Sequence, residues 1–312
     1  MKQALFNSDA PSERTWQQLR REVESQLATA GLASAATEAR WIVETASGRR
    51  GADLLAAQDQ PATEAVATRV ARMVERRVAG EPLQYVLGEW EFRGIDLFVD
   101  QRVLIPRPET EVTAQVAIDI ARRLGARRGH ANPWTGANGE YTVVDLGTGS
   151  GAIALALAAE LPDAEFWATD ASEDALAVAR ANLAGAGAGA TRMRLAHGEW
   201  FAALPDRLRG NVRVVVTNPP YVAEAELDQL PREVVDHEPR LALVSGPTGL
   251  EAIACIVTAA PQWLEPGGAL VVELAPHQSD EARGLARDAG LVDVVVERDL
   301  TDRDRVLVAH VQ

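Results

Sequence analysis

The sequence predicts an α/β protein: a doubly wound sheet of seven strands, preceded by a small helical bundle and a β-hairpin linker. From Tyr141 onward, apolar β-branched runs alternate with helical patterns, which is typical of a parallel sheet. The connection from Arg298 to Asp304 is too short for a crossover helix, so we expect the final strand to run antiparallel. The first 80 residues carry mainly helical periodicity.

The N-terminal bundle is expected to cover residues 1–80. Ser12 is the expected N-cap of its first helix, which Gly31 ends. A second helix ends at Gly48, a short one covers 53–57, and a third long one runs over 63–79. The pattern leaves open whether this bundle only stabilises the fold or recognises a partner. We take it as the substrate-recognition domain.

A linker over residues 81–106 is expected to follow. Tyr85, Leu87, Trp90 and Phe92 alternate with polar residues, so residues 83–99 predict one or two β-hairpins. Pro108 suits the first position of a helix that runs to about residue 124 and opens a catalytic domain over 107–312. Residues 125–140 are rich in turn formers and predict a mobile loop.

The sheet of the larger domain is predicted segment by segment. Its helices are expected near residues 151–160, 173–184, 248–264 and 278–289. Its strands are expected at residues 142–146, 165–169, 191–196, 212–217, 268–274, 292–297 and 304–310.

The composition, with 47% hydrophobic and 24% charged residues, is ordinary for a globular protein. No stretch approaches the roughly 20 apolar residues of a membrane span, and the first residues lack the apolar core of a signal peptide. We therefore expect a cytoplasmic protein without membrane contact. The 31 basic and 45 acidic residues give a net charge of −14, which repels a phosphate backbone and disfavours a nucleic-acid partner.

Cys255 is the only cysteine, which excludes an internal disulfide and fits a reducing compartment. It lies in the apolar run Ile253-Ala254-Cys255-Ile256-Val257, so we expect it to pack in the core. The five histidines show no ligand spacing with one another or with Cys255. We therefore predict no metal site.

A glycine-rich turn follows the first strand of the sheet. It comprises Gly147, Thr148, Gly149, Ser150 and Gly151, and a helix begins directly after it. Glycines let a backbone turn tightly and approach a ligand closely, and the amino end of a helix favours negative charge. The pattern alone also fits a variant of the dinucleotide-binding motif or a purely structural turn.

Two further positions suggest an adenosine site. Asp170 ends the next strand, where a carboxylate can accept hydrogen bonds from both hydroxyls of a ribose. Its alternative role is helix capping, which Ser172 can fill instead. Glu199 and Trp200 follow the third strand, where a ring can wall an adenine and an acid can accept from an amino group. The alternative is that Trp200 and Phe201 pack in the core.

Asn218-Pro219-Pro220-Tyr221 ends the buried strand 212–217, because proline cannot donate a ladder hydrogen bond. Ligands bind at the carboxyl ends of such strands. Asn218 Oδ1 and the Pro219 carbonyl can accept both N–H groups of a planar amino group, and Tyr221 can lie against its flat face. We call these four residues the clamp. A plain strand-ending turn is the alternative.

The combined motifs resemble those of the HemK/PrmC family, the peptide-chain-release-factor glutamine N5-methyltransferases. The resemblance covers the chain from about residue 80 to its end, and the helical part agrees in size and type. It rests on Pro82-x-Gln84-Tyr85-x-x-Gly88-Glu89-x-x-Phe92, Leu104-Ile105-Pro106-Arg107-Pro108-Glu109-Thr110-Glu111, Asn218-Pro219-Pro220-Tyr221-Val222, Glu238-Pro239-x-x-Ala242-Leu243, Gly246-x-x-Gly249-Leu250 and Pro266-Gly267-Gly268.

The resemblance implies a class I S-adenosylmethionine-dependent methyltransferase domain. The methyl group would pass to the side-chain amide nitrogen of the glutamine in the Gly-Gly-Gln motif of a class 1 release factor, leaving S-adenosylhomocysteine. The glycine turn would hold the methionine part, Asp170 the ribose, and Glu199 with Trp200 the adenine side. The chain is expected to act as a monomer.

The clamp residues Asn218, Pro219 and Tyr221 are then the expected catalytic residues, with Asn218 also bordering the cofactor and Pro220 the substrate. Arg107 and the Glu109–Glu111 segment are expected to shape the substrate entrance, with helix capping as the alternative. Two positions depart from the family pattern. Members commonly have aspartate where Glu199 stands, and glycine where Ala275 follows Glu273-Leu274.

Three alternatives share parts of this pattern. A glutamine methyltransferase of a large-subunit ribosomal protein shares the clamp, but its segment usually reads Pro-Arg-Ser-Pro where this chain has Pro106-Arg107-Pro108-Glu109. A DNA or RNA amino-methyltransferase predicts a basic face, which a net charge of −14 opposes. A nicotinamide-dependent dehydrogenase explains the glycine turn and leaves the clamp unexplained.

Overall fold

The computed structural model describes residues 11–127 and 141–312. The chain forms two compact units. The first comprises the described residues up to Gly88 together with Arg232–His237, and the second comprises the described parts of Glu89–Pro231 and Glu238–Gln312. The segment Arg232–His237, which follows the clamp in sequence, thus belongs to the first unit, and the residues before and after it belong to the second. No helix among the described residues is both long and apolar enough to span a membrane.

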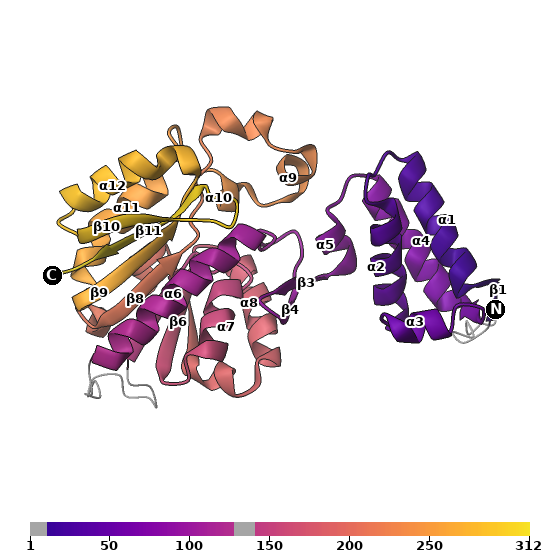
Figure 1. The fold of residues 1–312 in the computed structure, drawn as a ribbon, viewed down its shortest axis with the longest axis horizontal. Helices are drawn as coiled ribbons and strands as arrows, with labels where there is room; N and C mark the ends of the chain where they lie inside the picture. Colours follow the sequence, from indigo (N-terminus) through magenta and orange to yellow (C-terminus); the bar gives the residue numbers. More distant parts are fainter. Residues whose placement is uncertain (1–10, 128–140) are drawn as a thin grey trace, which may run out of the picture. The chain divides into compact units, whose positions relative to one another are not determined.

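The first unit is built from helices around one apolar core (Figure 1). Helix α1 buries Leu19, Val23 and Leu27, a spacing of four residues that places them on one face. The elements are β1 (Pro11–Thr15), α1 (Trp16–Thr29), α2 (Ala35–Ser47), α3 (Ala52–Ala56), β2 (Pro61–Thr63), α4 (Glu64–Val78), α5 (Leu83–Leu87) and α9 (Arg232–His237).

Two sequence expectations for this unit are wrong. Ser12 lies in β1, and Thr15 caps α1 instead, with its side chain accepting from the Gln18 N–H. Residues 83–87 form α5 and not a strand, because the N–H groups of Tyr85 and Val86 bond back to the Pro82 carbonyl. Gly88 then ends this helix in the left-handed conformation, with φ +76°.

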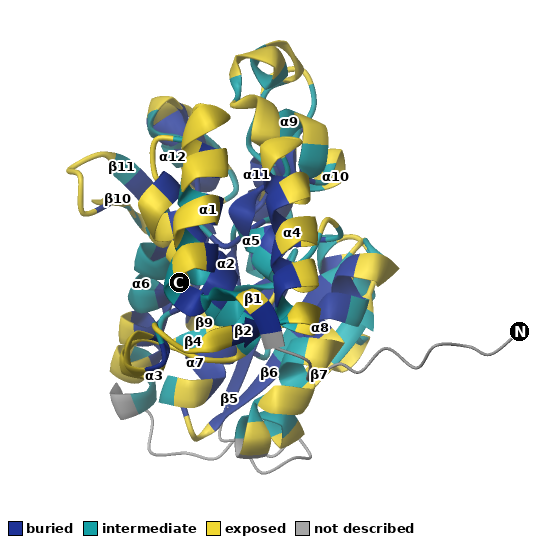
Figure 2. Ribbon diagram, turned by 90° about the vertical axis from the view of Figure 1, so that its right-hand side faces the viewer, coloured by how far each residue is buried: buried dark blue, intermediate teal, exposed yellow. Residues whose placement is uncertain are grey.

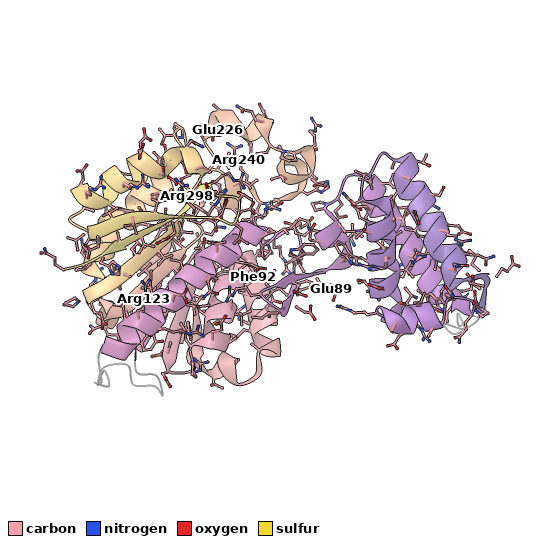
Figure 3. The ribbon with its side chains drawn as sticks, in the orientation of Figure 1. Glu89, Phe92, Arg123, Glu226, Arg240 and Arg298 are labelled. Atoms are coloured by element: carbon pink, nitrogen blue, oxygen red, sulfur yellow. The ribbon has the colours of Figure 1, made fainter. Side chains whose placement is uncertain are left out.

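The second unit opens with a β-hairpin, β3 (Glu89–Phe92) paired antiparallel with β4 (Ile95–Phe98). Glu89 and Phe92 are labelled on this hairpin in Figure 3. Phe92 is fully buried and Glu89 is half-buried. Helix α6 (Pro108–Arg127) follows and begins at the expected proline. The expected loop over 125–140 starts too early, since 125–127 belong to α6. Residues 128–140 lie outside the described residues.

A seven-stranded sheet forms the centre of this unit, in the order β10-β11-β9-β8-β5-β6-β7. Strand β11 runs antiparallel to both neighbours, as its short connection predicts, and the other pairings are parallel. The strands are β5 (Tyr141–Leu146), β6 (Ala164–Asp170), β7 (Met193–His197), β8 (Val212–Thr217), β9 (Leu264–Glu273), β10 (Val292–Arg298) and β11 (Asp304–His310).

Helices cover the sheet, and its central strands are buried along their length (Figure 2). Helix α6 contacts β8, β9 and α7, while α11 packs against α12. The remaining helices are α7 (Ala152–Glu160), α8 (Glu173–Gly185), α10 (Arg240–Leu243), α11 (Glu251–Ala259) and α12 (Ser279–Asp288), with short 3-10 turns η1 (Gly187–Arg192), η2 (Trp200–Ala203), η3 (Asp206–Leu208), η4 (Glu224–Gln229), η5 (Ala260–Gln262) and η6 (Pro276–Gln278).

Candidate active site

A cavity of about 630 Å³ opens in the second unit, at the carboxyl ends of strands β5, β6, β7 and β8. This volume is in the range of small-molecule and cofactor sites. The first four residues of the glycine turn (147–150), Asp170, Glu199, Trp200, Asn218 and Pro220 line it, whereas Gly151 does not. The ends of four strands, β5, β6, β7 and β8, therefore bring together most of the predicted cofactor residues and part of the clamp.

The glycine turn has the backbone conformation that its sequence predicts. Gly147, Gly149 and Gly151 have φ values of +68°, +55° and +84°, which side chains with a Cβ rarely adopt. The Thr148 N–H donates to the Thr169 carbonyl at 2.8 Å, which ties the turn to β6. Helix α7 starts directly behind it, so its amino end points at the cavity from this side.

Asp145 hydrogen-bonds the glycine turn and the start of α7, a role that was not predicted from the sequence. Its Oδ2 accepts from Thr148 Oγ1 at 2.6 Å and from the Ala154 N–H at 3.2 Å. Burial raises the pKa of this carboxyl to about 7, and Oδ1 has no hydrogen-bond partner among the residues that the structure describes. The available signal was an acid placed two residues before the first glycine of the turn.

Asp170 ends β6 and lines the cavity. Its two carboxylate oxygens each accept one backbone N–H, from Gly149 and from Ser172, both at 2.9 Å. Ser172 caps α8 by accepting from the Ala175 N–H, so Asp170 is not the cap. Burial raises the pKa of Asp170. Each oxygen retains a lone pair for a further donor, which matches the two adjacent hydroxyls of a ribose.

Trp200 and Phe201 have different roles, since Trp200 lines the cavity and Phe201 packs in the core. Phe201 is buried and stacks on Trp263, with ring centroids 5.5 Å apart. Trp200, at φ +47°, is partly buried, packs against the edge of this core and lines the cavity together with Glu199. A Cβ at Gly147 would lie 3.5 Å from the Trp200 ring, so the ring stands beside the glycine turn. An indole and an acid therefore form one wall of the cavity.

The clamp follows β8 as predicted, and only part of it reaches the cavity. Asn218 and Pro220 line the cavity, whereas Pro219 and Tyr221 are not among its lining residues. Asn218 Nδ2 donates to Thr110 Oγ1 at 3.1 Å. The Tyr221 carbonyl accepts from Gln278 Nε2 at 2.9 Å, and burial followed by the Glu273 carboxyl raises the pKa of the Tyr221 phenol. This phenol therefore stays protonated at neutral pH.

Arg107 and Glu109 do not line the cavity either. Arg107 forms an ion pair with Glu238, whose carboxylate is buried and also accepts from the Ile105 N–H at 3.3 Å. Glu109 lies 3.5 Å from Arg303, in the turn between β10 and β11. Two of the sequence motifs are thus fastened to each other through Arg107 and Glu238. A role of these residues at the substrate entrance stays a prediction.

A further part of the cavity wall comes from the segment that follows the clamp. Pro239, Leu241, Ala242, Val244 and Ser245 line the cavity. Nearby, Glu226 accepts from the Ala223 N–H at 3.2 Å and so caps η4; Glu226 and Arg240 are labelled in Figure 3. The sequence analysis assigned none of these wall residues, because this stretch has no strand or long helix in its pattern.

The expectation for Cys255 is wrong. Its side chain is exposed and lines the cavity beside Ala252, because α11 turns Ile253, Ile256 and Val257 into the core instead. A helix whose sequence is apolar all round does not reveal which face is covered. No cluster of three or more potential metal ligands occurs within 11–127 or 141–312.

The sequence matches two protein-family models and many proteins of known family. Residues 18–88 match the family model of the PrmC N-terminal domain, and residues 134–248 match that of the methyltransferase small domain. The chain is 37% identical to the release factor glutamine methyltransferase of Geobacter sulfurreducens, over 90% of this chain and 91% of the relative. It is 40% identical to the Bordetella pertussis protein of the same name, over 86% and 92%.

Among solved structures, the catalytic domain of hMettl16 with a MAT2A 3′UTR hairpin superposes with a TM-score of 0.52 at 14% identity, covering 81% of this chain and 84% of that one. At this identity the likeness shows the fold alone, that of a methyltransferase. The sequence relatives decide the family, since they match nearly the whole chain at 35–40% identity. The chain belongs to the release factor glutamine methyltransferase family.

Proposed function

We propose that this protein transfers the methyl group of S-adenosylmethionine to the side-chain amide nitrogen of the glutamine in the Gly-Gly-Gln motif of a class 1 release factor. The observation that carries the proposal is the shared cavity. Asp170, most of the glycine turn and Asn218 all line it, so the residues proposed for the cofactor and the residue proposed for the acceptor amide share one volume of about 630 Å³.

The residues present fit the cofactor. Asp170 has one unused lone pair on each oxygen, which suits the ribose hydroxyls. Trp200 offers an indole for the adenine side and Glu199 an acceptor for its amino group. The glycine turn exposes backbone close to the methionine part. S-adenosylmethionine supplies a methyl group activated by a sulfonium centre.

The clamp would orient the acceptor. A glutamine amide is a poor nucleophile, because its nitrogen lone pair is delocalised into the carbonyl. Asn218 Oδ1 and the Pro219 carbonyl would accept the two N–H groups and fix the direction of the nitrogen. Placing the reacting atoms about 3–3.5 Å apart in a fixed direction is a large part of such catalysis. Tyr221, a protonated phenol, would support the clamp from behind without acting as a base.

The other acceptors are less well supported. The net charge of −14 opposes a nucleic-acid acceptor, and the curated relatives carry the release-factor name over about 90% of this chain. A ribosomal-protein glutamine remains the second candidate on the strength of the shared clamp. The first unit, which matches the PrmC N-terminal domain, would recognise the substrate protein, and the enzyme would act as a monomer in the cytoplasm.

A transfer assay separates these acceptors. The purified protein is incubated with methyl-labelled cofactor and, in separate reactions, with a class 1 release factor, a release factor whose Gly-Gly-Gln glutamine is alanine, large-subunit ribosomal proteins, and total RNA. Label only on the intact release factor is expected. Label on a ribosomal protein or on RNA would reject the proposal, as would equal label on the alanine variant.

A further inference from the structure

A side-chain amide joins the glycine turn to the β3–β4 hairpin. Asn182 lies in α8 and is partly buried. Its Oδ1 accepts from the Phe98 N–H at 2.7 Å, and its Nδ2 donates to the Phe98 carbonyl at 3.0 Å and to the Ser150 carbonyl at 2.8 Å. Both N–H donors and the acceptor oxygen of this amide are therefore used. Because two carbonyls need donors and one N–H needs an acceptor, these partners also fix which way the amide is turned.

Both partners of Asn182 belong to parts of the chain that form the cavity. Ser150 is the fourth residue of the glycine turn, is 3% exposed and lines the cavity. Phe98 ends β4, and residues 99–107 lead from it to α6; we call them the connecting segment. The residues of the connecting segment that line the cavity are Arg102, Val103, Leu104 and Pro106.

The connecting segment is held at both ends by side chains. At its start, Asn182 bonds both backbone groups of Phe98, and the Arg102 guanidinium lies 5.9 Å from the centre of the Phe98 ring. Near its end, the Ile105 N–H donates to the buried carboxylate of Glu238 at 3.3 Å. The segment lies outside any helix or strand. Its position therefore depends on these side-chain contacts and on the packing of its own apolar residues.

We propose that Asn182 is a positioning residue for the cofactor, whose amide holds the connecting segment against the glycine turn and so keeps the cavity in the shape that binds S-adenosylmethionine. This inference rests on the proposed function. Asn182 is not among the residues that line the cavity, so it acts through Ser150 and Phe98. When only a fraction of the molecules has the binding-competent shape, the apparent dissociation constant rises in inverse proportion to that fraction.

Two substitutions of Asn182 test this role. Asn182→Ala removes the bonds to Phe98 and Ser150, so we expect the dissociation constant of S-adenosylhomocysteine, measured by calorimetry, to rise by about five- to thirtyfold. Asn182→Asp keeps the size of the side chain and the acceptor for the Phe98 N–H, but it turns a carboxylate oxygen toward the two carbonyls. Its affinity should fall at least as far as that of Asn182→Ala.

Asn211→Ala is the matched control. Asn211 lies at the amino end of β8, and its Nδ2 also donates to two backbone carbonyls, those of Arg207 at 3.2 Å and Arg209 at 2.8 Å. It is not among the cavity-lining residues, so cofactor affinity should stay within about twofold of wild type.

Kinetics with a release factor separate positioning from loss of structure. In both Asn182 variants the KM for S-adenosylmethionine should rise, while kcat at saturating cofactor should stay within about threefold of wild type, because the clamp is unchanged. A loss of folded enzyme would instead lower kcat and leave KM unchanged. That result, with an unchanged affinity for S-adenosylhomocysteine, would contradict the positioning role.

Hydrogen–deuterium exchange of the wild-type protein gives a measurement that does not depend on the folding of a variant. S-adenosylhomocysteine should slow exchange in the connecting segment, because the cofactor favours the molecules in which this segment is in place. Unchanged exchange there would overturn the inference. Asn182→Ala and Asn182→Asp proteins that both bind within about twofold of wild type would overturn it too, as would an equal loss in Asn211→Ala.

Failure of the proposed function gives a different result. A wild-type protein that binds S-adenosylhomocysteine and leaves the release factor unmethylated rejects the proposed acceptor. The affinities of the Asn182 variants still decide the present inference in that case, so the two failures are distinguishable.

Discussion

Asp170→Asn is the most informative change in the cofactor half of the site. The carboxylate now serves two backbone N–H groups at 2.9 Å, one from Gly149 and one from Ser172, with one lone pair left on each oxygen. The amide replaces one of these acceptor oxygens by an NH₂ donor. One backbone N–H and one ribose hydroxyl therefore lose their acceptor, whichever way the amide turns.

The expected loss follows from these bonds. A hydrogen bond to a charged group contributes about 1.5–3 kcal/mol, which corresponds to about a 10- to 150-fold rise in the dissociation constant of the cofactor. Burial raises the pKa of Asp170, so its ionised form costs folding free energy, and a neutral amide relieves that cost. The melting temperature of the cofactor-free protein should therefore change little.

Calorimetric titration with S-adenosylhomocysteine measures this effect directly. Glu173→Gln is the matched control, because Glu173 begins α8 only three residues later and its side chain is 82% exposed. The control should bind within about twofold of wild type. An Asp170→Asn protein that also binds within twofold would refute the assignment of Asp170 to the ribose.

Three further changes test the rest of the account. Asn218→Ala should lower kcat by at least about a hundredfold with cofactor affinity nearly intact; near-normal turnover in a single-turnover assay would contradict the clamp. Gly249→Ala places a Cβ 2.6 Å from the Tyr221 carbonyl oxygen at φ +80°, so urea unfolding should show a loss of about 2–3 kcal/mol, and unchanged stability would contradict this packing. Arg77→Ala strands the buried Glu38, which Arg77 Nε contacts at 2.7 Å, and should destabilise the first unit by about 3–5 kcal/mol. Burial opposes ionisation of Glu38, but hydrogen bonds from Arg77 and Ser34 outweigh it and lower the pKa of this carboxyl. The free energy of unfolding that the ion pair contributes is therefore present above the unfolded pKa of 4.5, and it is lost as pH falls through the lower folded pKa. The urea midpoint of the wild type should drop accordingly below pH 4.5, and a midpoint that is flat there would contradict it.

The sheet could be predicted because its signals are local. Val212–Thr217 is a run of β-branched residues closed by two prolines, and β8 has these same bounds. The short connection before Asp304 predicted the antiparallel β11 from chain length alone. In contrast, the alternation of Tyr85 and Leu87 suggested a strand, and the local bonds to Pro82 and the left-handed Gly88 made it a helix.

Half of the site depends on contacts between residues far apart in the sequence, which no local sequence pattern predicts. Asp170 and the glycine turn are adjacent to strand ends, and the sequence shows those ends. Thr110 and Asn218 are 108 residues apart, and Thr113 and Glu273 are 160 apart, so only the folded sheet brings them together. The prediction for Cys255 was wrong for a related reason, since the elements that pack against α11 decide which of its faces is covered.

The most direct test of the central proposal is the position of the methyl group. A class 1 release factor is incubated with the enzyme and S-adenosylmethionine, digested, and sequenced by tandem mass spectrometry. We predict a single methyl group on the side-chain amide of the Gly-Gly-Gln glutamine, absent when Asn218→Ala replaces the wild-type enzyme. A methyl group on any other residue, or an unmodified release factor, would contradict the proposed function.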